Sequence, residues 1–256
     1  MKHCLWLLCC WCVWLQAAPL LLVTGEFTPY TGKALPDGGE STRLVTTLLQ
    51  EAGYRELQVD YLPWPRGYQL TRNGLVAATF PYAWTAERAK LFHYSAPIHI
   101  DHLSWFTYRG SEAIQAGRWQ GLRVCIPLGW STSHADGVIK RFGLDLQRPK
   151  TLAQCLQLLD RKRIDLLPMN ETVTRDASRQ LFGDPCHLQA LPHFRQSDTF
   201  YLIISRQYPE AANLLERFNH ALAAARADGR YDQLVSRADG RYDQLVSRAG
   251  KGIDCR

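Results

Sequence analysis

Residues 85–97 read Thr85-Ala-Glu-Arg88-Ala-Lys-Leu-Phe-His-Tyr-Ser95-Ala-Pro97 and carry the densest pattern of the chain. Thr85 is a helix N-cap candidate, because its hydroxyl can accept a hydrogen bond from a backbone N–H of the first turn. The pattern therefore predicts a helix over 85–92. Apolar runs on either side, Leu75–Thr79 and Leu103–Tyr108, are expected to be strands. A helix between two strands is typical of α/β proteins.

The same alternation continues in both directions along the chain. Further strands are expected at Leu20–Val23, Leu57–Leu62, Arg123–Pro127, Ile164–Met169 and Phe200–Ser205. Further helices are expected at Ser41–Ala52, His134–Phe142, Leu152–Leu159, Thr172–Leu181 and Pro209–Ala227. We therefore predict an α/β fold of mainly parallel sheets flanked by helices. The pattern restarts near residue 109 and returns near 198, which predicts a second lobe inserted into the first.

The composition is that of an ordinary globular protein. Of 256 residues, 46% are hydrophobic and 21% charged, which excludes disordered, collagen-like and coiled-coil classes. The length suits two lobes of roughly 100–130 residues each. The net charge of +6 comes from scattered side chains, with no basic run longer than Arg161–Arg163. This distribution favours a solvated basic surface over a nucleic-acid-binding one.

The N-terminus resembles a secretory signal peptide. Lys2 and His3 precede an uncharged apolar run, Cys4–Leu15, which is too short to cross about 30 Å of hydrocarbon comfortably. We expect cleavage after Ala17, so that residues 1–17 are removed and the mature protein is soluble in the periplasm. An uncleaved anchor is the alternative, and lipoprotein processing at Cys9 is disfavoured because no small residue precedes it.

The cysteine count follows from this export. Four of the eight cysteines lie in the signal segment, which leaves Cys125, Cys155, Cys186 and Cys255. An even number in an oxidising compartment predicts up to two disulfides, and three full pairings are open.

An exact duplication lies near the C-terminus. Residues 227–237 read Ala-Asp-Gly-Arg-Tyr-Asp-Gln-Leu-Val-Ser-Arg, and residues 238–248 repeat them. Two copies are too few for a solenoid. We therefore expect one copy to pack and the other to extend the C-terminal tail; a functional repeat is the alternative.

Several motifs, in order along nearly the whole mature chain, resemble one family. They are Phe27–Tyr30, Thr85–Pro97, Gly121–Val124 with Gly129, Arg163–Leu166, Phe218-Asn219 and Arg226–Tyr231. The sequence resembles the periplasmic solute-binding proteins of ABC importers for polar amino acids, the bacterial extracellular solute-binding protein family 3 with the type II periplasmic-binding fold. The resemblance implies two lobes joined by two hinge strands: lobe 1 at 18–107 and 198–256, and lobe 2 at 108–197.

Arg88 matches the family's carboxylate-binding arginine. A planar guanidinium makes two parallel charge-assisted hydrogen bonds to a carboxylate, which lysine does not imitate. The alternative is an exposed helix arginine paired with Glu87 or Asp101.

The loop before Arg88 departs from the family's small hydroxyl residues. Pro81 has no N–H and Ala83 no hydroxyl, so only Tyr82 is expected to supply a hydroxyl to the ligand's carboxylate. The departure puts a standard amino-acid ligand in question.

The opposing lobe departs as well. Asn170 matches the family's ammonium-binding aspartate but carries no charge, which predicts weaker binding of an α-ammonium. Glu171 is an alternative partner, although an acid also suits the start of a helix.

The remaining candidates are aromatic and hydroxyl side chains. Tyr30 and Trp64 are expected to wall the cleft, with core packing as the alternative for each. Trp130, Ser131 and Thr132 match the ligand loop of the second lobe, although the two hydroxyls also suit helix caps. Trp64 is expected in a loop, because prolines flank it.

Two other functions stay open. Arg88, Glu171 and a histidine in a cleft could support a hydro-lyase-type reaction, but the sequence shows no Gly-x-Ser-x-Gly, no P-loop and no nucleophile beside a base. His99 and His102 would face opposite sides of an extended segment, so we predict no metal site there. A ligand-presenting or sensory binding protein is the other alternative. We predict a monomeric binding protein, not an enzyme, without a cofactor, that captures a small carboxylate-bearing solute for an inner-membrane ABC permease.

Overall fold

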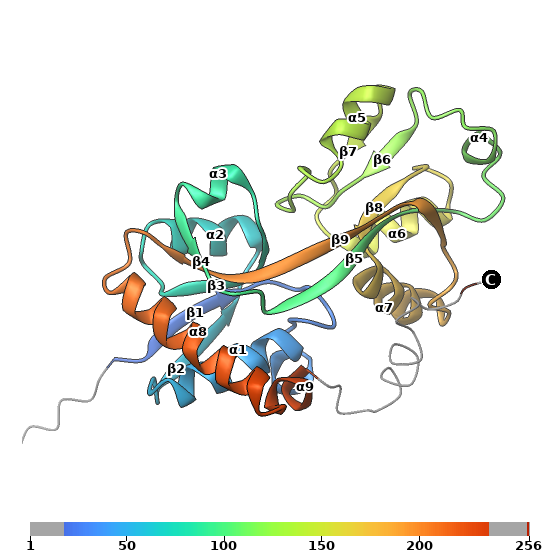
Figure 1. Ribbon diagram of the computed structural model, residues 1–256. Coiled ribbons are helices and arrows are strands. Elements are labelled where there is room, and N and C mark those ends of the chain that lie inside the picture. Colours follow the sequence, from blue (N-terminus) through green and yellow to red (C-terminus); the bar gives the residue numbers. More distant parts are fainter. Residues whose placement is uncertain (1–17, 236–254, 256) are drawn as a thin grey trace, which may run out of the picture.

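The structure, a computed structural model, describes residues 18–235 and residue 255 (Figure 1). The expected signal segment, 1–17, and the second copy of the duplication, 238–248, lie outside the described residues. None of the helices between residues 18 and 235 combines the length and the hydrophobicity that a membrane-spanning helix needs.

The first lobe is an α/β layer built on three parallel strands. β1 (Leu20–Thr24) pairs with β2 (Leu57–Tyr61) on one side and β3 (Ala78–Ala83) on the other, and β4 (Phe92–Tyr94) lies at another edge of the sheet. Its helices are α1 (Glu40–Glu51), α2 (Trp64–Arg72), α3 (Ala86–Ala89), α8 (Ala211–Ala227) and α9 (Arg230–Val235). The core forms because α1 repeats its apolar residues at helical spacing, so that Leu44, Val45, Leu48 and Leu49 are completely buried.

The second lobe is smaller. β6 (Arg123–Cys125) pairs in parallel with β7 (Asp145–Gln147), and β8 (Leu167–Asn170) lies beside β6. Its helices are α4 (Glu112–Gln115), α5 (Asp136–Phe142), α6 (Leu152–Asp160) and α7 (Glu171–Phe182). Thr151 caps α6 through a reciprocal pair of hydrogen bonds with Gln154.

Two long strands cross between the lobes (Figure 1). They are β5 (His99–Thr107) and β9 (Gln189–Ser205), which pair antiparallel with each other. The large sheet runs β2-β1-β3-β9-β5-β8, with β4 on β9. The two-lobed α/β fold is thus confirmed. Parallel pairing holds within each lobe, but every pair that includes β5 or β9 is antiparallel, because the chain leaves and returns through them in opposite directions. The lobe boundaries stay a prediction; residue 107 ends β5, and residue 197 lies within β9.

Some elements differ from the expected ranges. β3 begins at Ala78 rather than at Leu75, because Gly74 has a φ of +69° and Leu75 is 64% exposed in a turn. α3 ends at Ala89, and Phe92 begins β4. Trp64 begins α2 instead of lying in a loop, since Pro65 fits the first helical turn, where its missing N–H has no consequence.

The disulfides are Cys125–Cys155 and Cys186–Cys255. The first joins β6 to α6 inside the second lobe, where both cysteines are buried. The second joins the loop after α7 to the C-terminus, 69 residues further along the chain. Between these points, α9 is attached to the first lobe, because the Tyr231 hydroxyl donates to the Ile98 carbonyl at 2.7 Å.

Candidate functional site

A small cavity, here called the inner cavity, lies between the lobes and has a volume of about 80 Å³. It is lined from both lobes and from β9 by Phe27, Trp64, Pro81, Tyr82, Ala83, Arg88, Gly129, Trp130, Ser131, His134, Met169, Asn170, Asp198 and Phe200. Six of the eight residues expected at the site are therefore brought together: Trp64, Tyr82, Arg88, Trp130, Ser131 and Asn170.

Arg88 is held in place by its own lobe. The Thr85 hydroxyl accepts from the Arg88 backbone N–H at 3.2 Å, which confirms the expected N-cap. The guanidinium donates through Nη1 to the Ala83 carbonyl at 3.0 Å and lies 4.9 Å from the centre of the Tyr82 ring. No ion pair of Arg88 is present within the described residues, so its remaining N–H groups are free to bind a carboxylate.

Asp198 also lines the inner cavity, although no sequence pattern predicts it there. The Asn170 amide Nδ2 donates to Asp198 Oδ2 at 3.0 Å, which joins the end of β8 to β9. Burial raises the pKa of Asp198, while the hydrogen bond from Asn170 and the positive charge of Arg88 act in the opposite direction. The cavity therefore contains a carboxylate next to the uncharged Asn170. Its only sequence signal was an acid just before the expected strand at 200.

Aromatic rings form much of the wall. Phe27 meets Trp130 edge-on at 5.2 Å and Trp64 edge-on at 6.3 Å between ring centres. Trp64 also meets Tyr82 edge-on at 5.5 Å, and its indole N–H donates to the Glu26 carbonyl at 3.3 Å. Burial raises the pKa of Tyr82 above its usual value, so its hydroxyl keeps the proton and can donate to an anion.

The loop of the second lobe contacts the first lobe. Gly129 has a φ of +85°, and a Cβ on it would lie 2.7 Å from the Pro65 ring. Ser131 lines the cavity, and its hydroxyl is within 2.8 Å of the Ser133 hydroxyl. Thr132 lies outside the lining, and its carbonyl accepts from the Ala135 and Asp136 N–H groups at the start of α5.

Tyr30 lies in the core rather than in the cavity wall. Its ring stacks on His99 at 4.1 Å, and the His99 ring stacks on Phe200 at 4.8 Å. Asp101, two residues along β5, is buried and accepts from the Thr172 hydroxyl of α7 at 3.0 Å. Tyr30 and its neighbours therefore form the packing where the two lobes meet.

Glu171 does not line the inner cavity, because its carboxylate binds other side chains. It begins α7, and its Oε1 accepts from the Ser104 hydroxyl and from Arg195 Nε, the latter at 2.9 Å. His99 and His102 both lie in the extended β5, and the described residues contain no group of three His, Cys, Asp or Glu side chains placed to hold a metal.

The chain is similar to known proteins in its fold but not detectably in its sequence. The sequence matches no protein-family model and no curated protein. The ligand-binding core of GluR0 from Nostoc punctiforme, solved with L-glutamate, is 20% identical, with a TM-score of 0.70 over 89% of this chain and 99% of that one. The arginine-, lysine-, histidine-binding protein ArtJ from Geobacillus stearothermophilus is 15% identical, with a TM-score of 0.71 over 90% and 96%.

A third similar structure belongs to a sensor. It is a histidine kinase sensor domain described as similar to periplasmic binding proteins, 20% identical, with a TM-score of 0.71 over 84% of this chain and 93% of that one. These likenesses confirm the resemblance to the two-lobed periplasmic-binding-protein fold. A ligand-binding core, an amino-acid-binding protein and a sensor domain therefore share this fold.

Proposed function

We propose that the protein is a periplasmic solute-binding protein that captures an amino acid, or a similar small carboxylate-bearing solute, between its lobes for ABC-type import. Arg88 holds the solute's carboxylate, and Asp198 with Asn170 faces its ammonium. Trp64, Tyr82 and Trp130 wall the cleft, and Ser131 supplies a hydroxyl from the second lobe. The protein binds the solute without transforming it.

One observation carries the proposal: the inner cavity is lined by both a cationic and an anionic side chain. Arg88 reaches it from the first lobe, and Asp198 lies on β9. A zwitterion presents both charges within one small head group, and each charge is stabilised when the partner charge is already in place. The proteins of similar fold that are described as binding glutamate, or arginine, lysine and histidine, support this reading.

The departures from the family's usual residues change how such a solute is held. Pro81 and Ala83 take away two donors, so Arg88 and the Tyr82 hydroxyl hold the carboxylate with less help. On the other side, Asp198 supplies the charge that Asn170 lacks. The expectation of weak ammonium binding, made from Asn170 alone, is therefore replaced in this proposal by a two-residue acceptor.

A thermal-shift screen of the mature protein against the common L-amino acids and small organic acids tests the proposal. A ligand at 100 times its dissociation constant stabilises the folded state by about 2.7 kcal/mol, which is readily measured. Arg88→Ala should abolish the shift with every hit, and Asp198→Asn should abolish it only with solutes that carry an ammonium. Arg55→Ala, an exposed arginine outside the cavity, is the matched control. Hits unaffected by Arg88→Ala would overturn the assignment.

The import role has its own test, because a sensory protein of the same fold would bind solute equally well. Cross-linking of the solute-loaded protein in native membranes, followed by mass spectrometry, should identify an ABC permease. Recovery of a receptor kinase instead would support the sensory alternative. The similarity to a histidine kinase sensor domain is the reason for testing it.

A further inference from the structure

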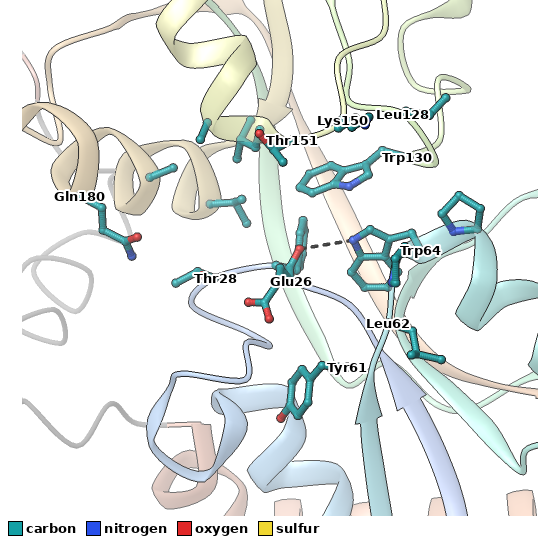
Figure 2. A pocket seen from close by; sticks show the side chains of 17 residues that line it. Glu26, Thr28, Tyr61, Leu62, Trp64, Leu128, Trp130, Lys150, Thr151 and Gln180 are labelled. Atoms are coloured by element: carbon teal, nitrogen blue, oxygen red, sulfur yellow. Dashed lines mark hydrogen bonds between the residues drawn. The ribbon is translucent and has the colours of Figure 1, made fainter.

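A second and larger cavity, here called the outer cavity, opens between the lobes beside the inner one. Its volume is about 700 Å³, and Figure 2 shows the side chains that line it. Glu26, Tyr61 and Trp64 come from the first lobe, and Trp130, Thr151 and Gln180 from the second. None of its polar side chains has a part in the proposed binding of an amino-acid head group.

The two cavities share a wall. Phe27, Trp64 and Trp130 line both of them, and Figure 2 shows the two indole rings one above the other. A solute whose head group reaches Arg88 and Asp198 therefore has the outer cavity directly beyond these rings. The inner cavity, at about 80 Å³, is far below the roughly 300–1,000 Å³ usual for ligand sites, whereas the outer cavity falls within that range.

On the side of the first lobe, the outer cavity is lined, among the described residues, by one charged side chain, the carboxylate of Glu26. Glu26 is exposed, and one of its carboxylate oxygens accepts a hydrogen bond from the backbone N–H of Lys33 at 3.1 Å. Within the described part of the chain, no cationic side chain forms an ion pair with Glu26. Lys150 also lines the cavity but comes from the second lobe, and Figure 2 shows it beyond Trp130 from Glu26. A cationic side chain on its way to Glu26 would pass the indole rings of Trp64 and Trp130, whose faces attract positive charge.

We propose that the outer cavity is a second part of the solute site and takes the long side chain of an α-amino acid that ends in a cationic group. The side chain passes Trp64 and Trp130 and brings its cation to Glu26. The solute class is then an amino acid extended beyond the common twenty, about the size of a side-chain-linked dipeptide. The inference rests on the proposed function, because Arg88 and Asp198 hold the head group.

The test is a series of probes with one head group and growing side chains. Isothermal titration calorimetry of the mature protein compares L-alanine, L-lysine, Nε-acetyl-L-lysine and Nε-(L-lysyl)-L-lysine. Affinity should rise at least tenfold from L-alanine to Nε-(L-lysyl)-L-lysine. Glu26→Gln should lower affinity for Nε-(L-lysyl)-L-lysine about tenfold, as expected for loss of one charged partner, and leave Nε-acetyl-L-lysine unchanged. Glu56→Gln, an exposed acid away from both cavities, is the matched control.

A second variant keeps the head-group site intact and fills the outer cavity. Ala177→Phe on α7 should abolish the gain of the long probe while leaving binding of L-alanine or L-lysine as it was. Equal affinity across the series, or a long probe unaffected by both variants, would overturn the inference and leave the proposed function in place. Failure of all four probes to bind would overturn both for amino-acid solutes.

Discussion

Asp101 and His99 lie two residues apart on β5, where the lobes meet, and burial acts on both of them. Burial raises the pKa of Asp101 to about 6 and lowers the pKa of His99 to about 3. Each side chain is therefore held toward its neutral form. The two side chains affect the free energy of unfolding in opposite directions as the pH changes. The stabilising contribution of His99 is lost as the pH falls from 6.5 toward 3, because the unfolded chain takes up the proton first. The stabilising contribution of Asp101 is lost as the pH rises from 3.8 through 6, because the unfolded chain releases the proton first.

Replacing Asp101 should isolate one of these effects. At pH 8 the ionised carboxylate is buried at a cost, and the difference between 3.8 and about 6 corresponds to at most about 3 kcal/mol. Asp101→Asn keeps an oxygen for the Thr172 hydroxyl, so it should raise the free energy of unfolding at pH 8 and much less at pH 4. Urea unfolding at both pH values measures this, with Asp60→Asn as the control. An equal change at both values would contradict it.

At the scale of the elements, the loop between β6 and α5 packs closely against the start of α2 at Gly129. Gly129→Ala would place a Cβ 2.7 Å from the Pro65 ring and so keep the lobes apart. We expect solute affinity to fall at least tenfold, with a loss of stability of about 1 kcal/mol from the positive φ. Gly110→Ala is the matched control, because Gly110 has a φ of +76° and open space around it. Calorimetry with a solute found in the screen measures both variants, and equal affinities would show that solute binding does not need the close contact between Gly129 and Pro65.

Local sequence patterns predict those helices whose periodicity and caps are set by neighbouring residues in the chain. The periodicity of α1 and the cap at Thr85 both appear as expected. β9 is different: only its last residues are apolar enough to be recognised, and its first part, including Gln196, Ser197 and Asp198, is a strand because it pairs with β5. That pairing joins residues about ninety positions apart, which no local pattern encodes.

The residues that line the inner cavity also differ in whether a local pattern predicts them. Arg88 and Asn170 lie in segments whose spacing resembles a family, so each could be matched by position. Asp198 enters the site only because β9 brings it beside Asn170. Tyr30 was expected at the cleft because it is aromatic, but stacking on His99 places it in the core.

At the scale of the whole molecule, the two disulfides link segments that are far apart in the chain. The sequence alone allows three full pairings of the four cysteines, and the structure has Cys125–Cys155 and Cys186–Cys255. Cys186→Ser with Cys255→Ser should lower the free energy of unfolding by about 2–4 kcal/mol, because the bond closes a long loop. Solute affinity should not change, since neither cysteine lines a cavity. Denaturant unfolding and calorimetry on the same samples separate the two effects. Loss of affinity at full folding would show that the bond also affects how the lobes meet.

The duplicated segment gives a prediction of the same scale. The described part of the first copy is packed on the first lobe, since Tyr231 and Leu234 make hydrogen bonds to Ile98 and Arg43. Deleting residues 238–248 should therefore leave the melting temperature and solute affinity nearly unchanged. Non-reducing mass spectrometry would check that Cys186 still pairs with Cys255. A collapse of either property despite correct pairing would show that the second copy is needed.

The bond between Cys186 and Cys255 also has a consequence for proteolysis. It makes residues 186–255 a covalent ring that contains β9, α8 and α9 and therefore touches both lobes. A protease that cuts once within this ring opens it but releases no fragment, because both halves stay attached through sulfur. In an oxidising compartment, the segment that follows a single cut therefore stays covalently attached to the second lobe through Cys186.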